Sequence, residues 1–136
     1  MNKNVGVDRV KNLEKNIKIN LPLNSMGKLV LFVCKGNSGR SQMAQAFFNK
    51  LCKPNRAISA GILLDKSIHP QTIKVMKELG IDIKNQTPKQ LTQGLMESAD
   101  KIIITNPSLV KYIPERYLPK IEIWEIEGLL GKSLKK

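Results

Sequence analysis

Apolar residues gather in four short runs that are separated by amphipathic or polar segments. The first run, residues 29–33 (LVLFV), is too apolar and β-branched for a surface strand and too short for a membrane span. It therefore predicts a buried parallel strand. The same pattern predicts three further strands, at residues 56–61, 99–105 and 120–124.

Between these runs, apolar residues recur every three or four positions, which is the spacing of amphipathic helices. One helix is predicted from Arg40 to about Leu51, before Pro54, and another from about residue 68 to Gly80. Strands that alternate with helices predict a single α/β domain, with a four-stranded parallel sheet and helices on both faces.

The chain of 136 residues is long enough for one hydrophobic core. We assign residues 27–136 to the domain and residues 1–26 to an N-terminal extension. In the extension, Val10, Leu13 and Ile17 recur at helical spacing and indicate a short amphipathic helix. The role of this extension is left open.

The candidate chemistry lies between the first strand and the first helix. Cys34 follows the strand, and residues 35–39 (KGNSG) lead to Arg40. Two glycines and an asparagine allow positive φ values and let the backbone turn its N–H groups inward. The following helix adds the positive end of its dipole. This loop is therefore predicted to hold a tetrahedral oxyanion at the carboxyl end of the first strand.

Cys34 and Arg40 complete the predicted site. A cysteine at the mouth of such a loop lies in a positive potential, which favours the nucleophilic thiolate. Arg40 offers a planar, two-pronged donor that matches two oxygens of a phosphate. The pattern indicates a nucleophilic cysteine beside a bound oxyanion, in preference to a structural cysteine in an ordinary strand-to-helix turn.

The sequence Cys-x5-Arg-Ser after a hydrophobic strand, with Gly-Asn inside the loop and Ser-Gln-Met-Ala behind it, resembles the low-molecular-weight protein tyrosine phosphatases and their arsenate reductase relatives. The resemblance extends over about residues 28–134. It implies phosphate-monoester hydrolysis through a phosphocysteine on Cys34, without a metal or cofactor. The substrate would be a phosphorylated protein or a small phosphate ester.

The resemblance also implies roles for individual residues. Ser41 would hold the Cys34 thiolate and ease its departure. Ser59 would donate a hydrogen bond to Asn37 and brace the loop. The implied phosphate-binding residues are Lys35, Gly36, Asn37, Ser38, Gly39 and Arg40.

The sequence departs from this family at the catalytic acid. Gly128 and Leu129 occupy the positions where related phosphatases carry Asp-Pro, and Glu127 is the nearby carboxylate that could substitute. The redox cysteines that thiol-dependent arsenate reductases carry after the third strand are also absent. In the family a last helix would follow this stretch, so the resemblance leads us to expect a domain that is shortened at its C-terminus. Two alternatives therefore stay open: arsenate reduction with an external thiol, and oxyanion binding with little or no turnover.

Cysteine content and charge limit the remaining function classes. Two cysteines and one histidine cannot supply a four-ligand zinc site or a disulfide framework, which fits the cytoplasm. Cys52 lies about 18 Å from the loop at ~1.5 Å per helical residue, so we predict a structural role. No apolar run is long enough for a membrane span.

The net charge of +12 comes from lysines scattered along the chain, with few aromatic residues and no nucleic-acid recognition motif. We therefore expect the charge to attract phosphate, sulfate or arsenate to the site rather than nucleic acid. A homo-oligomer is left open.

Overall fold

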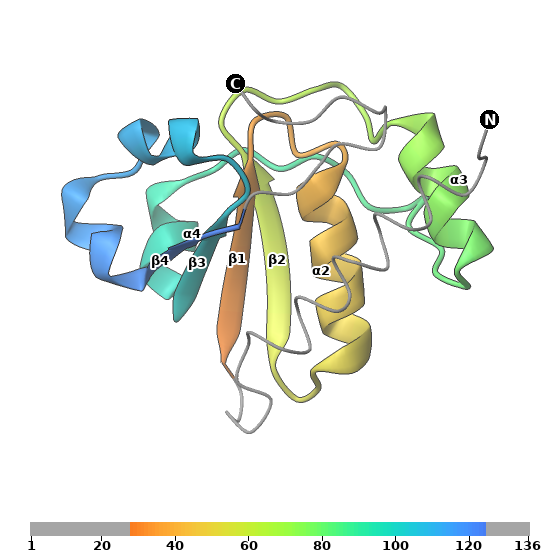
Figure 1. Cartoon of the computed structure of the whole chain (residues 1–136), viewed down its shortest axis with the longest axis horizontal. Coiled ribbons are helices and arrows are strands. Elements are labelled where there is room, and N and C mark those ends of the chain that lie inside the picture. The colour runs from red at the N-terminus through yellow and green to blue at the C-terminus, as the bar shows by residue number, and fades with distance from the viewer. Residues whose placement is uncertain (1–27, 125–136) are drawn as a thin grey trace.

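The computed structural model describes residues 28–124, which form a parallel sheet flanked by helices (Figure 1). The predicted extension, residues 1–26, and the candidate acid Glu127 lie outside the described residues. Within residues 28–124, no helix is long and apolar enough to cross a membrane. The elements in chain order are β1 (Leu29–Cys34), α2 (Arg40–Leu51), β2 (Arg56–Gly61), α3 (Pro70–Glu78), α4 (Gln93–Ser98), β3 (Lys101–Ile104), the 3₁₀ helices η1 (Pro107–Tyr112) and η2 (Glu115–Lys120), and β4 (Ile121–Ile123).

The sheet has the strand order β2-β1-β3-β4, and its neighbouring strands are parallel, as predicted. The chain adds β2 on one side of β1 and then crosses over to add β3 on the other side. In open α/β sheets, ligands bind at such a reversal, outside the carboxyl ends of the strands. Cys34, the last residue of β1, pairs with Gly61 of β2 at this edge.

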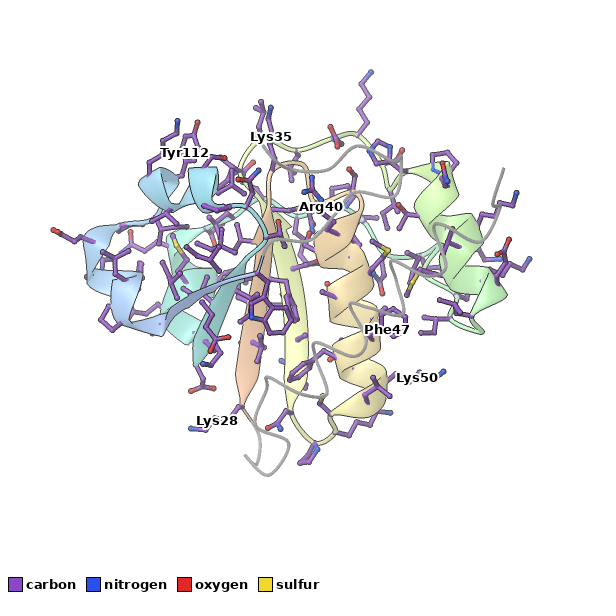
Figure 2. The ribbon with its side chains drawn as sticks, in the orientation of Figure 1. Lys28, Lys35, Arg40, Phe47, Lys50 and Tyr112 are labelled. Atoms are coloured by element: carbon purple, nitrogen blue, oxygen red, sulfur yellow. The ribbon has the colours of Figure 1, made fainter. Side chains whose placement is uncertain are left out.

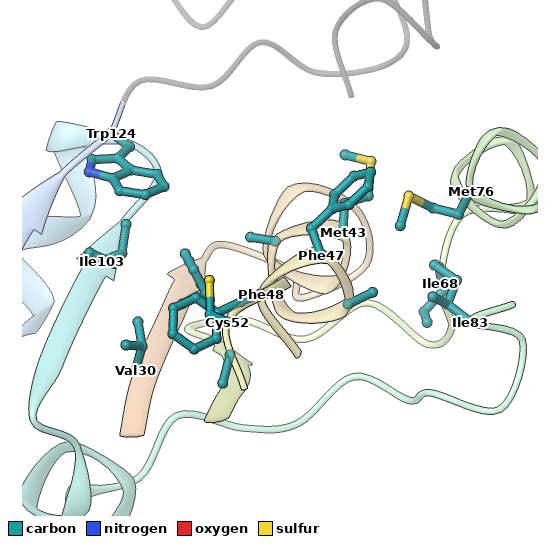
Figure 3. Packing of buried hydrophobic residues seen from close by; sticks show 14 of the residues in the cluster. Val30, Met43, Phe47, Phe48, Cys52, Ile68, Met76, Ile83, Ile103 and Trp124 are labelled. Atoms are coloured by element: carbon teal, nitrogen blue, oxygen red, sulfur yellow. The ribbon is translucent and has the colours of Figure 1, made fainter. Parts of the chain in front are cut away.

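Helices cover both faces of the sheet, which confirms the predicted layers. Because side chains alternate along a strand, Val30 and Phe32 face one side of β1 while Leu31 and Val33 face the other. The first side packs against α2 and α3, and the second against α4, η1 and η2. Figure 3 shows the first cluster, which extends from Trp124 and Ile103, past Phe48 of α2, to Met76 of α3.

Helix α2 has the predicted bounds, and it carries the residues that follow the loop. Helix α3 ends just before Gly80, whose φ of 84° is the left-handed conformation that glycine adopts most readily. Helices α4, η1 and η2 have only six residues each and are not predicted by the pattern of apolar residues. These short elements carry too few turns for a clear helical period.

Candidate functional site

The loop between β1 and α2 lies at the carboxyl end of the sheet. Figure 2 shows Lys35 and Arg40 at this end, whereas Lys28 lies at the opposite end of β1. Cys34 is 4% exposed, so its thiol sits below the surface of the loop. Arg40 is the first residue of α2 and therefore stands at the positive end of the helix dipole.

The carbonyl groups of the loop point outward, toward the segment that follows β2. Because the N–H and C=O of a trans peptide lie on opposite sides of the bond, these outward carbonyls turn the N–H groups of the same peptides into the loop. Inward N–H groups form the nest that binds a tetrahedral oxyanion. The contacts are Ile62 N to Cys34 O (3.2 Å), Leu63 N to Lys35 O (2.8 Å), Asp65 N to Gly36 O (3.1 Å) and His69 N to Ser38 O (3.0 Å).

One residue gives the loop its turn, and it is not a glycine. Asn37 has a φ of 55°, whereas neither loop glycine has a positive φ, and Gly39 has a φ of −144°. Asparagine tolerates the left-handed conformation because its short amide can bond locally. The expectation that the glycines supply positive φ values is therefore wrong, while the expectation for Asn37 is confirmed.

The Asn37 side chain is fully buried and fastens the loop from within. Its Oδ1 accepts a hydrogen bond from the Lys89 N–H at 2.6 Å, and its Nδ2 donates to Ser41 Oγ at 2.8 Å. Ser38 adds a hydrogen bond from its hydroxyl to the Asp65 carboxylate. The loop is thus held by side chains of its own and by two distant segments.

Two donors meet at the sulfur of Cys34. The Asn37 N–H donates to Sγ at 3.1 Å, and Ser41 Oγ lies 2.8 Å from the same sulfur. An ionised sulfur can only accept, so in that state the Ser41 hydroxyl donates to Sγ while it accepts from Asn37. Hydrogen bonds donated to a charged form favour that form, so this arrangement favours the thiolate.

Arg40 supplies the positive charge beside this sulfur. Burial lowers the pKa of its guanidinium, and the negative charge of Cys34 acts in the opposite direction. Arginine remains protonated in proteins throughout the physiological pH range. The site therefore combines a hydrogen-bonded cysteine sulfur, a cation and inward amides, an arrangement suited to nucleophilic attack on an oxyanion.

Ser59 does not make the predicted hydrogen bond to Asn37. Its hydroxyl donates to Gln45 Oε1 of α2 at 2.6 Å. The reason is the register of the two strands. Ser59 pairs with Phe32, two residues before Cys34, so it lies further from the loop along β2, beside the second turn of α2.

The braces that Ser59 was expected to provide come from residues that the sequence analysis missed. Gln42 of α2 is fully buried, and its Nε2 contacts Asn37 Oδ1 at 3.1 Å. Gln86 donates to Gln42 Oε1 at 2.6 Å. The segments that meet here are more than 40 residues apart in sequence, so no local spacing reveals them.

Comparison with known proteins gives consistent matches over this fold. Residues 29–123 match the family model described as "Low molecular weight phosphotyrosine protein phosphatase". The Glutaredoxin arsenate reductase of Synechocystis sp. is 37% identical over 108 residues, which cover 79% of this chain and 82% of the relative. Arsenate reductase 2 of Staphylococcus epidermidis is 32% identical over 108 residues, which cover 77% of this chain and 81% of the relative.

A solved structure shares the fold and contains a ligand. Vibrio vulnificus Wzb, in complex with benzylphosphonate, superposes with a TM-score of 0.66 at 26% identity. The match covers 71% of this chain and 73% of Wzb. A phosphonate is a tetrahedral oxyanion, the class of ligand for which the loop geometry is suited.

Proposed function

Since this chain belongs to the low molecular weight phosphotyrosine protein phosphatase family, we propose that it is a cysteine-based enzyme that reduces arsenate to arsenite with an external thiol. The observation that carries the proposal is the hydrogen-bonded sulfur of Cys34 at the base of the loop, with Cys52 as the other cysteine of the described residues, buried away from this loop. The arsenate reductases among its relatives favour this reaction over the phosphate-monoester hydrolysis that the motif alone suggests.

In the first step, the loop amides and Arg40 hold arsenate with its arsenic facing Cys34. The Cys34 thiolate attacks arsenic, an S–As bond forms, and one arsenate hydroxyl takes up a proton and leaves as water. Arsenic stays in the pentavalent state. Because the leaving group is the arsenate's own hydroxyl, this step needs no protein acid to protonate an ester oxygen, which fits a chain with Gly128 and Leu129 at the Asp-Pro positions.

In the second step, an external thiolate attacks Sγ of Cys34. The S–As bond breaks with its electron pair going to arsenic, which leaves as trivalent arsenite after taking up two protons. The two sulfurs lose the same two electrons and become a mixed disulfide between Cys34 and the donor. A second donor thiol then attacks the donor's sulfur and releases the Cys34 thiolate.

Cys52 is a poor internal donor for this second step. It is 2% exposed beyond the last turn of α2, and burial raises the pKa of its thiol. Helix α2 separates it from Cys34 by about 18 Å at ~1.5 Å per residue, whereas a disulfide requires Cα atoms within ~7 Å. The electrons must therefore come from outside the chain, and the name of the Synechocystis relative suggests glutaredoxin as the donor.

The test is arsenate-dependent thiol oxidation by the native protein, with separate glutathione–glutaredoxin, mycothiol and thioredoxin systems and with arsenite measured as the product. Native protein and Cys52→Ser should both turn over, and Cys34→Ser should not. Turnover in Cys34→Ser, or no arsenite from native protein with any of the donors, would overturn the proposal.

Phosphate-monoester hydrolysis is the second candidate, favoured by the family and by benzylphosphonate in Wzb. Without a general acid, which typically increases the rate about 10²–10⁴-fold, rates of hydrolysis should fall steeply as the leaving phenol becomes more basic.

The test of this second candidate is a series of aryl phosphates on native protein, Glu127→Gln and Gly128→Asp. If the rate of the native protein depends little on the pKa of the leaving phenol and Glu127→Gln makes this dependence steep, Glu127 is the acid. If the dependence of the native protein is steep and Gly128→Asp makes it shallower, the native protein lacks a general acid. Oxyanion binding without either turnover indicates a binding protein.

A further inference from the structure

A buried glutamine lies behind the oxyanion loop. Gln42, in the first turn of α2, has no exposed surface. Its Nε2 lies 3.1 Å from both Asn37 O and Asn37 Oδ1, and 3.0 Å from Thr87 O. Its Oε1 accepts a hydrogen bond from Gln86 Nε2 at 2.6 Å. A buried amide is costly unless both ends have partners, and here both do.

Backbone groups fix the orientation of the two glutamine amides. The carbonyl oxygens of Asn37 and Thr87 can only accept, so the amide nitrogen of Gln42 must face them. The Gln42 oxygen then faces away, where only a donor fits, and Gln86 supplies one. Neither amide can turn round without placing two acceptors, or two donors, against each other.

A backbone group fixes the next link as well. The Lys89 N–H can only donate, so the Asn37 atom at 2.6 Å is the amide oxygen and Nδ2 faces Ser41. Ser41 therefore accepts from Asn37, and when Cys34 is ionised and can only accept, the Ser41 hydroxyl donates to its sulfur. The donors thus point in one direction, from Gln86 through Gln42, Asn37 and Ser41 to Cys34.

We propose that Gln42 and Gln86 are positioning residues for the nucleophile, which act on Cys34 through Asn37 and Ser41. Hydrogen bonds whose donors point the same way polarise one another, so the Gln86 donor strengthens the last bond, to the thiolate. This role deepens the proposed function and rests on it only in that Cys34 is the reacting atom. It does not require arsenate as the substrate.

The outer end of this chain of hydrogen bonds is anchored to the sheet. Gln86 belongs to the segment between α3 and α4, and three residues later Lys89 O accepts a hydrogen bond from the Gly61 N–H at 2.8 Å. Leu91 N donates to Gly61 O at 2.8 Å. The end of β2 therefore places the segment that holds Gln86, which gives the donor a defined position.

The test is the rate of Cys34 alkylation by iodoacetamide as a function of pH, resolved from Cys52 by peptide mapping. In Gln86→Leu, which removes the donor but keeps the bulk, the midpoint of the profile should move to higher pH. The rate at pH 6 should fall by up to roughly fourfold, because polarisation changes the strength of the bond to the thiolate by only about 10–30%. The limiting rate at high pH should stay native, because the fully ionised thiolate is equally accessible.

Two further variants sharpen the test. Gln86→Glu should shift the midpoint at least as far as Gln86→Leu, because Gln42 cannot turn its oxygen away from the new carboxylate. Gln90→Leu is the matched control: Gln90 Nε2 donates to the Gly61 and Ile62 carbonyls from the same segment but does not join the chain to Cys34. Its profile should match the native one. Thermal unfolding of each variant shows that the fold is retained.

A native midpoint in both Gln86 variants would overturn the inference. A lower limiting rate at high pH with an unchanged midpoint would also overturn it, because that result would indicate a damaged loop and not a less stabilised thiolate. If the midpoint shifts while native protein reduces no arsenate, the positioning role stands and the proposed reaction fails.

Discussion

Cys34 and Cys52 differ in their surroundings more than in their exposure, which is 4% and 2%. Two hydrogen bonds reach the sulfur of Cys34, whereas Cys52 packs in the apolar cluster between α2 and the sheet, where burial raises its pKa. We predict that iodoacetamide at mildly acidic pH labels Cys34 and leaves Cys52 unmodified, measured by peptide mapping. Preferential labelling of Cys52 would contradict the assignment of the nucleophile.

Arg40 contributes a positive charge to the oxyanion loop. Its removal should therefore weaken the binding of any tetrahedral oxyanion. Hydrogen bonds to charged groups contribute about 1.5–3 kcal/mol, so Arg40→Ala should weaken phosphate or vanadate binding by roughly 10–100-fold or more. Isothermal titration calorimetry measures this change. The control is Lys50→Ala, which removes a cation from the far end of α2 and should bind like native protein. Equal affinity in Arg40→Ala and native protein would refute the site.

The residues that sequence reasoning identified are those whose partners lie close in the chain. Cys34, Asn37 and Ser41 fall within eight consecutive positions, so the loop motif and the family resemblance that it carries identify them together. Gln86 meets Gln42 across 44 positions, and Lys89 meets Asn37 across 52. Such contacts depend on how α3 and the following segment return to the sheet, and no local pattern encodes that path.

At the scale of elements, the end of β2 packs closely against the loop between β1 and α2. A Cβ on Gly61 would lie 2.9 Å from both Asn37 N and Lys35 O, which are backbone atoms that cannot move without deforming the loop. We predict that Gly61→Ala lowers the free energy of unfolding by about 1–3 kcal/mol, as overpacking does, and weakens oxyanion binding. Urea unfolding and calorimetry measure the two effects.

The control for Gly61→Ala is Gly94→Ala in α4. A Cβ there meets only Thr92 Oγ1, at an ordinary 3.8 Å. Because alanine favours a helix over glycine by about 0.5–1 kcal/mol, this variant should be as stable as native protein or more so. If Gly61→Ala were equally stable and bound oxyanions normally, β2 would not constrain the loop as the structure indicates.

The predicted and missed elements differ in length and burial. The bounds of α2 and β2 match the prediction because strong apolar periods and small or helix-breaking residues mark their ends. The third strand is shorter than predicted and begins at Lys101, since Ala99 ends α4 as its cap and the Asp100 side chain accepts from the Leu29 N–H. That hydrogen bond joins residues 71 positions apart and has no local signature.

At the scale of the whole molecule, both the topology and the net charge favour the binding of anions. The reversal of strand order places the carboxyl end of β1 where open α/β sheets bind ligands, and a net charge of +12 favours the approach of anions to the molecule. The lysines are dispersed along the chain, so the field is a property of the entire molecule and reaches beyond the contacts of Arg40.

Salt should therefore slow the arrival of anions at Cys34 without changing the thiolate itself. The Debye length is about 30 Å at 0.01 M salt and about 8 Å at 0.15 M, so the field of distant lysines is screened over this range. At a pH where Cys34 is fully ionised, the rate constant for alkylation by anionic iodoacetate should fall roughly three- to tenfold. Neutral iodoacetamide attacks the same sulfur and should react at a nearly constant rate. An equal fall for both reagents would place the effect on the thiolate, and no fall for iodoacetate would mean that only the charges within the loop guide anions to the site.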